Sequence, residues 1–120
     1  MTIRSGEPMD YEQTIMQIIA SSGEARSLSL KAVRTARAGN LEEAGEMIKN
    51  AKTSLTKAHK VQTGLIQAEG RGEKTEITLL MIHAQDHLMN ALTVRELAVE
   101  LIEEIKERKA LELELKGSVN

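Results

Sequence analysis

The feature of this sequence that most restricts its fold is the scarcity of residues that build β-sheets and tight turns. Its 120 residues include one proline, one tyrosine and neither phenylalanine nor tryptophan. Strands favour aromatic and β-branched side chains and are joined by turn residues. The abundant Ala, Leu, Glu and Lys favour helices instead. We therefore expect an all-α fold.

Two short breaks divide the chain into three segments. At the first, Gly39 suits the end of one helix, and Asn40 with Glu43 suits the capped start of the next. The second break is the polar loop 69–72. In the first two segments, apolar or small residues recur mainly at spacings of three and four, as along one side of a helix. They are Ile15, Ile18, Ser22, Ala25, Ser29, Ala32 and Ala36, then Leu41, Ala44, Ile48, Ala51, Leu55, Ala58, Leu65 and Ala68.

The ends of the helices are predicted from capping signals. The first helix is expected to begin near Asp10, which would cap it after Pro8. The third is expected to begin at Thr75 or Glu76 and to run toward Leu113. Because both connections are short, the three helices must form an antiparallel up-down-up bundle.

The chain is expected to form a single domain with less ordered ends. A chain of 120 residues fits one domain, covering residues 1–120. Residues 1–9 are expected to be a flexible N-terminal segment, and residues 114–120 a frayed C-terminal tail.

Charge and cysteine content exclude several functions. The formal net charge is −2 and no basic run stands out, so we expect no nucleic-acid partner. The lack of cysteine excludes disulfides, thiolate metal sites and cysteine nucleophiles. No run of eighteen apolar residues and no signal-peptide pattern is present, so a cytoplasmic location is expected.

The third segment differs from the other two between Ile77 and Leu92. At 100° per residue, Ile82 and Met89 point nearly opposite to the side that carries Ala84 and its apolar neighbours. A helix that is apolar on all sides is a buried helix. Since each helix of a three-helix monomer should keep one wet face, this segment predicts contacts with other subunits.

One polar stripe crosses that apolar segment. It consists of His83, Asp86, His87 and Asn90, which share one helix face because their spacings are three, four and seven. Two histidines four residues apart can bind one metal ion, but the zinc-protease motif fails because Ala84 stands where its glutamate would be. The stripe can equally be a set of buried polar groups that hydrogen-bond across an interface.

A third interpretation of the stripe is nucleophilic catalysis. A neutral imidazole nitrogen can accept a phosphoryl group near pH 7, because the ordinary pKa of histidine is about 6.5. Asp86 and His87, one turn from His83, are the plausible partners that would set which nitrogen is free. The pattern alone leaves all three interpretations open.

Three stretches resemble a known family. They are SSGEARSLSLKAV, AHKVQTGLIQAEG and EITLLMIHAQDHLMNALTVRELAVELIEEIK, which begin at Ser21, Ala58 and Glu76. Across nearly the whole chain the sequence resembles the enzyme IIA component of the lactose/cellobiose family of the bacterial sugar phosphotransferase system. The HAQDHLM run, positions 83 to 89, is long and specific. The resemblance implies a homotrimer of three-helix subunits, packed as a nine-helix bundle.

The resemblance also implies a function. The first histidine of HAQDHLM, His83, accepts a phosphoryl group on Nε2 from the histidine-containing phosphocarrier protein and passes it to a cysteine of the IIB component. The IIB component then phosphorylates sugar that enters through the membrane component IIC. The transfer itself needs no cofactor, and a β-linked disaccharide is expected, with cellobiose or chitobiose favoured over lactose.

The neighbours of His83 are given supporting roles. Asp86, shared among three subunits, is expected to bind Mg²⁺ or another divalent cation at the trimer axis. The cation would neutralise the three Asp86 carboxylates. His87 is expected to orient His83 or to hydrogen-bond the phosphate. Gln85 lies roughly 160° from His83 on an ideal helix. It is expected to contact a different surface of the cleft between subunits.

Three other residues lie outside the polar stripe. His59 is expected to have no catalytic role, while Arg26 and Ser27 are candidates for the neighbouring subunit's side of the cleft. The alternative function is a non-catalytic trimeric scaffold. In it the polar stripe would only be a buried layer of side chains that hydrogen-bond to one another.

Overall fold

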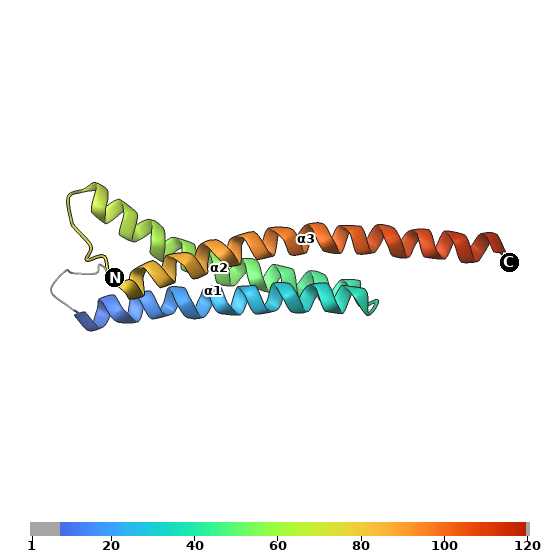
Figure 1. Ribbon diagram of the computed structural model, residues 1–120, viewed down its shortest axis with the longest axis horizontal. Coiled ribbons are helices and arrows are strands. Elements are labelled where there is room, and N and C mark those ends of the chain that lie inside the picture. Colours follow the sequence, from blue (N-terminus) through green and yellow to red (C-terminus); the bar gives the residue numbers. More distant parts are fainter. Residues whose placement is uncertain (1–7, 120) are drawn as a thin grey trace.

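The computed structural model describes residues 8–119, which form three α-helices. They are α1 (Pro8–Arg37), α2 (Leu41–Gly70) and α3 (Leu79–Val119). The helices alternate in direction and lie along a common long axis, so that the molecule measures 72 × 23 × 22 Å (Figure 1). The predicted all-α, up-down-up arrangement is confirmed.

The core is built from the residues that recur along the first two helices. All seven predicted positions of α1, from Ile15 to Ala36, are fully buried. Five of them are serine or alanine, and such small side chains let neighbouring helices approach closely. One core cluster joins Ile15 and Ile18 to Leu55 and Leu88, and a second lies around Ile102.

Both breaks end a helix in the same way. Gly39 and Gly72 have positive φ angles of 102° and 89°, which glycine adopts without a steric penalty. At the first break, Asn40 N–H donates to Thr35 O at 3.1 Å, and Gly39 N–H donates to Ala36 O at 3.0 Å. The same pair of bonds closes α2, so each helix ends in a Schellman motif.

The predicted cap of α2 is only partly correct. Asn40 precedes the first residue of α2, and its carbonyl accepts from Ala44 N–H at 3.0 Å. Its side chain makes no capping hydrogen bond, so the box expected with Glu43 is not formed. With φ −92° and ψ 68°, the backbone of Asn40 departs from the extended conformation usual for a capping residue.

Two helix starts also differ from the prediction. α1 begins at Pro8, so Asp10 lies inside its first turn; the fixed φ of proline suits the first helical position. α3 begins at Leu79 instead of Thr75 or Glu76, because Thr78 caps it: Met81 N–H donates to Thr78 Oγ1 at 3.1 Å. Of the predicted N-terminal segment, residues 1–7 lie outside the described part of the chain.

The loop before α3 is attached to α1 by the single tyrosine. The Tyr11 hydroxyl donates a hydrogen bond to the carbonyl of Glu76. Burial raises the pKa of Tyr11, while a hydrogen bond with Thr78 acts in the opposite direction. These contacts hold the start of α3 beside the start of α1.

The helices do not pack equally. α1 packs along both α2 and α3, whereas α2 and α3 contact each other less, and the C-terminal part of α2 diverges from α3 (Figure 1). The C-terminal part of α3 projects beyond the other two helices. It is helical to Val119, and Leu111 to Ser118 are all exposed; fraying of residues 114–120 stays a prediction. Within residues 8–119, no helix has both the length and the apolar character required to cross a membrane.

Candidate functional site

The first turns of α3 are fixed by one helix face. Met81, Ala84, Leu88 and Ala91 are buried against the other helices, at relative exposures of 8, 0, 0 and 0%. Their spacing of three and four residues determines the rotation of α3. The side chains of the polar stripe are therefore directed away from the centre of this core.

The two histidines of the stripe contact each other. Nε2 of His83 lies 3.0 Å from Nε2 of His87, and the rings meet edge to face, with centroids 4.4 Å apart and planes at 88°. His83 is exposed and His87 is half-buried. At this distance one Nε2 must carry a proton and donate it to the lone pair of the other.

This contact determines the chemistry available at the pair. If His87 donates, the Nε2 lone pair of His83 is the acceptor, and His83 carries its own proton on Nδ1. This is the tautomer that a nucleophilic Nε2 requires. The lone pair becomes available when His87 turns aside, and the His87 N–H can then donate to an incoming anionic oxygen.

Asp86 lies on the same stripe in an apolar setting. Its side chain is exposed, and the neighbouring outward positions hold Leu79, Ile82 and Met89, which are 82, 56 and 54% exposed. Among residues 8–119, no three His, Asp or Glu side chains are placed to hold a metal ion. The single carboxylate of Asp86 would need ligands from other chains to bind a cation strongly.

Gln85 faces α2 instead of the histidines. Its side-chain carbonyl accepts a hydrogen bond from Gln62 Nε2, and its own amide lies 3.7 Å from Met81 Sδ. The structure therefore separates Gln85 from His83 within one chain, and its supporting role stays a prediction. The contact with Gln62 joins two helices, and no spacing within the sequence of either helix predicts it.

The other residues singled out in the sequence do not take part in the contact between His83 and His87. His59 is exposed on α2, and Arg26 and Ser27 are exposed on α1. Asn90 is also exposed, one turn beyond His87 on α3. The exposure of Arg26 and Ser27 leaves them accessible to another subunit, and their role in a cleft stays a prediction.

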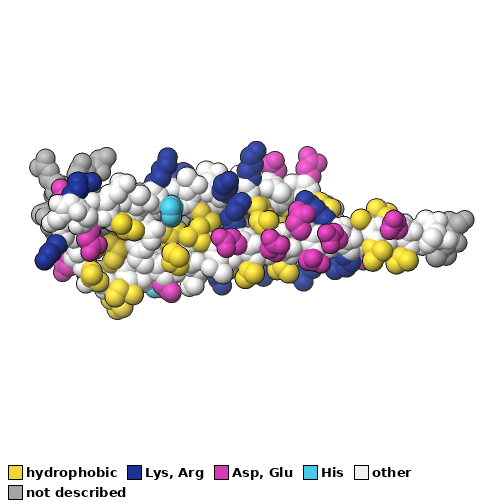
Figure 2. All heavy atoms as spheres, turned by 90° about the horizontal axis from the view of Figure 1, so that it is seen from above, with side chains coloured by type: hydrophobic (Ala, Val, Ile, Leu, Met, Phe, Trp, Pro, Cys, Tyr) yellow, Lys and Arg dark blue, Asp and Glu magenta, His cyan; other side chains and the backbone are white. Residues whose placement is uncertain are grey.

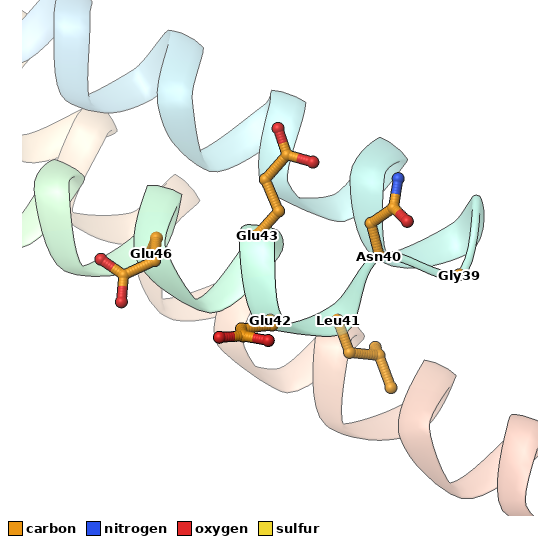
Figure 3. Close-up of a pocket in the computed structure, with 6 residues that line it drawn as sticks. All are labelled: Gly39, Asn40, Leu41, Glu42, Glu43 and Glu46. Carbon is orange, nitrogen blue, oxygen red and sulfur yellow. The ribbon is translucent and has the colours of Figure 1, made fainter.

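A separate depression lies at the turn between α1 and α2, at the other end of the bundle from the start of α3 (Figures 1 and 3). Its volume is about 660 Å³, and it is lined by Gly39, Asn40, Leu41, Glu42, Glu43 and Glu46. The Glu43 carboxylate points away from those of Glu42 and Glu46 (Figure 3). Because these acids do not converge, the histidine pair is the better candidate for chemistry.

Comparison with known proteins gives one consistent family. The family model described as "PTS system, Lactose/Cellobiose specific IIA subunit" matches residues 13–106. The lichenan-specific phosphotransferase enzyme IIA component of Bacillus subtilis (strain 168) is 53% identical over 94 residues, which is 78% of this chain and 86% of that protein.

Solved structures of similar proteins have the same fold. A cellobiose-specific enzyme IIA from Bacillus anthracis is 52% identical with a TM-score of 0.79, over 82% of this chain and 90% of that one. In the complex of the chitobiose IIA with HPr from Escherichia coli, the matching chain is 40% identical with a TM-score of 0.70. That match covers 82% of this chain and 95% of the other.

Proposed function

Because the chain belongs to the lactose/cellobiose-specific IIA family of the phosphotransferase system, we propose that it carries phosphate on His83. The donor is the histidine-containing phosphocarrier protein, and the acceptor is a cysteine of a IIB component, which serves a IIC membrane component. The observation that carries the proposal is the His83–His87 contact, in which an exposed imidazole has its Nε2 held 3.0 Å from a second imidazole. We place this relay in the cytoplasm.

The first transfer moves phosphorus from one imidazole nitrogen to another. The Nε2 lone pair of His83 attacks the phosphorus in line, the N–P bond of the donor phosphohistidine breaks, and its electron pair returns to the donor ring. Such transfers depend mainly on positioning and on stabilisation of charge on the equatorial oxygens. The exposure of His83 allows a partner protein to approach it directly.

His87 supports both stages of this reaction. While it donates to His83 Nε2, it selects the tautomer with the proton on Nδ1. After it turns aside, its Nε2–H donates to a phosphoryl oxygen, and such charge-assisted bonds are stronger than neutral ones. In the second transfer, a thiolate of the IIB cysteine attacks the phosphorus, the N–P bond to His83 breaks, and an S–P bond forms.

We further propose that three copies associate through the outer face of α3. Leu79, Ile82 and Met89 present an apolar surface that association would remove from water. Asp86 lies among them, and three carboxylates brought together on an axis would repel one another unless neutralised. Their oxygens suit Mg²⁺ or a similar cation, which would have a structural role and take no part in the transfer.

The relatives support the choice of partner and of sugar. One of them was solved in complex with HPr, the histidine-containing phosphocarrier protein. This complex supports the same donor here. The names of the similar proteins include lichenan, cellobiose and chitobiose. We propose a β-linked disaccharide of the cellobiose or chitobiose type as the sugar of the system.

Phosphorylation with purified components tests the central proposal. The chain is incubated with phosphoenolpyruvate, enzyme I and the phosphocarrier protein, and the label is followed by mass and by its stability to acid and alkali. Wild type should gain one acid-labile, alkali-stable phosphate per chain. His83→Ala should gain none, and the exposed His59→Ala is the matched control that should be labelled normally.

The alternative scaffold function predicts a different outcome. A non-catalytic trimer would leave wild type unlabelled while its association stayed intact. Label that persists in His83→Ala but disappears in His87→Ala would move the phosphate to the second histidine and reject the assignment of His83.

A further inference from the structure

The two ring nitrogens that meet at the candidate site are also a pair of metal ligands. His83 and His87 are one helical turn apart, and their Nε2 atoms are 3.0 Å from each other. Two histidines four residues apart on a helix can both reach one metal ion. Water can fill the other positions of such an ion, as it fills the open position of a catalytic zinc site. The pair is therefore sufficient for a site that binds and releases its ion.

The distance between the two nitrogens indicates which coordination geometry fits them. Metal–imidazole bonds are about 2.0–2.1 Å long, so two nitrogens at right angles around one ion lie about 2.9 Å apart. At the tetrahedral angle the two nitrogens lie about 3.3 Å apart. The observed 3.0 Å is closer to the right-angled arrangement, which is that of tetragonal Cu²⁺ and Ni²⁺ sites.

The histidine pair is open to an ion from solvent. His83 is exposed and His87 is half-buried. For both lone pairs to meet on one ion, the His87 ring must turn, and the same movement frees His83 Nε2 for phosphoryl transfer. The proton on His87 Nε2 then moves to Nδ1 through water, so that both rings bind as neutral imidazoles.

The charges around the pair favour a cation. Asp86 lies between the two histidines in the sequence and is exposed, and α3 carries no lysine or arginine from Leu79 to Val94. On the face shown in Figure 2, hydrophobic side chains gather over the half of the molecule in which α3 begins, and acidic ones gather farther toward its C-terminal end. Carboxylates suit Mg²⁺ and similar ions, whereas imidazole suits transition metals. A transition-metal ion is therefore directed to the histidines.

We propose that His83 and His87 together bind one divalent transition-metal ion, Cu²⁺ or Ni²⁺, and that the bound ion blocks phosphorylation of His83. The ion takes the Nε2 lone pair that would attack phosphorus, so the metal and the phosphoryl group exclude each other. The exclusion is reciprocal, because a phosphorylated Nε2 has no lone pair left for a metal. The block rests on the proposed phosphocarrier function, whereas the binding of the ion does not.

Titration calorimetry with Ni²⁺ and with Cu²⁺ tests the site. The full-length chain is used without a polyhistidine tag, which would itself bind these ions. Wild type should bind one ion per chain, and His83→Ala and His87→Ala should each bind it about tenfold or more weakly. The single exposed histidine of α2 provides the matched control, since His59→Ala should bind like wild type. Pulsed electron paramagnetic resonance of the Cu²⁺ form should show two coordinated imidazoles in wild type and one in each of the two α3 variants.

Two results would overturn the metal site. One is equal affinity of wild type and His83→Ala. The other is a loss of affinity in His59→Ala as large as that in His87→Ala. Either result would show adventitious binding to scattered surface histidines only.

The block is measured with purified phosphorylated phosphocarrier protein, so that enzyme I is absent. Ni²⁺ at ten times its dissociation constant leaves about one chain in eleven free, so labelling of wild type should slow by about tenfold. A chelator should restore the rate. His87→Ala, which binds the ion more weakly, should lose no more than about half of its own rate at the same Ni²⁺ concentration. Equal slowing of the two chains would place the effect of Ni²⁺ on the donor and reject the block.

The outcome is separable from that of the phosphocarrier function. Labelling of metal-free wild type reports on the proposed function alone. If wild type is labelled but binds no ion through the pair, only the metal proposal fails. If metal-free wild type is not labelled, the phosphocarrier proposal and the block fail, while calorimetry still decides whether the pair binds the ion.

Discussion

The two faces of α3 between Leu79 and Leu92 have similar composition and different surroundings. The inner face, with Ala84 and Leu88, is completely buried by α1 and α2. The outer face, with Leu79, Ile82 and Met89, is more than half exposed and has a carboxylate among its apolar side chains. The first face accounts for the fold of one chain, and the second fits contacts between chains.

The histidine pair lies where these two faces meet. On an ideal helix, His83 is about 100° from Ala84 on one side and about 60° from Asp86 on the other. A side chain at this boundary can stay accessible when the outer face is covered. One short segment of α3 can therefore use its inner face for packing, its outer face for association and the histidine pair for chemistry.

The largest expected effect distinguishes the two faces by stability. Leu88→Ala should lower the free energy of unfolding by about 2–5 kcal/mol, because it leaves a cavity in the core. Met89→Ala, its neighbour on the outer face, should change the unfolding of dilute monomer by less than about 0.5 kcal/mol. Chemical denaturation at low protein concentration measures both, and equal losses would refute the assignment of the faces.

The next effect concerns the carboxylate of the outer face. Asp86→Leu removes three charges that the proposed trimer would bury together, and replacing buried charges by apolar groups often stabilises by about 1–4 kcal/mol. The variant should form trimers that are tighter and insensitive to chelator, whereas wild-type trimers should weaken when divalent cations are removed. Sedimentation with and without chelator checks this, and Glu43→Leu on the exposed surface of α2 serves as the control.

The boundary between the faces is tested through His87. His87→Ala removes the group that contacts His83 Nε2 at 3.0 Å, so the rate of phosphoryl transfer should fall about tenfold or more. His87→Gln retains a side-chain N–H donor and should recover part of the rate. Because His87 belongs to neither core cluster, thermal unfolding should change little, and a rate loss that followed a loss of stability would contradict a role in positioning.

Sequence alone predicted the parts of this molecule that depend on periodicity. Most of the buried residues of α1 and α2, and the separation of Met81 and Leu88 from Ile82 and Met89, follow from the spacing of apolar and small side chains. Ser54 is buried outside the predicted stripe. Local hydrogen bonding was harder to predict. The start of α3 is set by the Thr78 hydroxyl. The side-chain cap expected from Asn40 and Glu43 does not form, and Asn40 N–H donates to Thr35 O.

The candidate site was predicted in part for the same reason. Helical spacing places His83 and His87 together on one face, and their rings do touch. The pairing of Gln85 with Gln62 depends on the distance between two helices, which no local pattern specifies. The projection of the C-terminal part of α3 beyond the other helices likewise depends on the relative lengths of the three helices, which no local pattern specifies.

The smallest expected effect concerns a defect on the inner side of the bundle. The hydroxyl of Ser22 is buried and has no hydrogen-bond partner among the described residues, whereas Ser29, also on α1, donates to Ala25 O at 2.8 Å. An unsatisfied buried polar group costs about 1 kcal/mol or more, so Ser22→Ala should stabilise the chain by roughly that amount.

Ser29→Ala is the matched comparison for Ser22→Ala. It removes a satisfied hydroxyl together with its hydrogen bond, so its effect on the free energy of unfolding should be close to zero or slightly destabilising. Denaturant titrations of the two variants measure the difference. If Ser22→Ala proved the less stable of the two, the Ser22 hydroxyl would have a hydrogen-bond partner in solution, and the buried side of α1 would contain one more satisfied polar group.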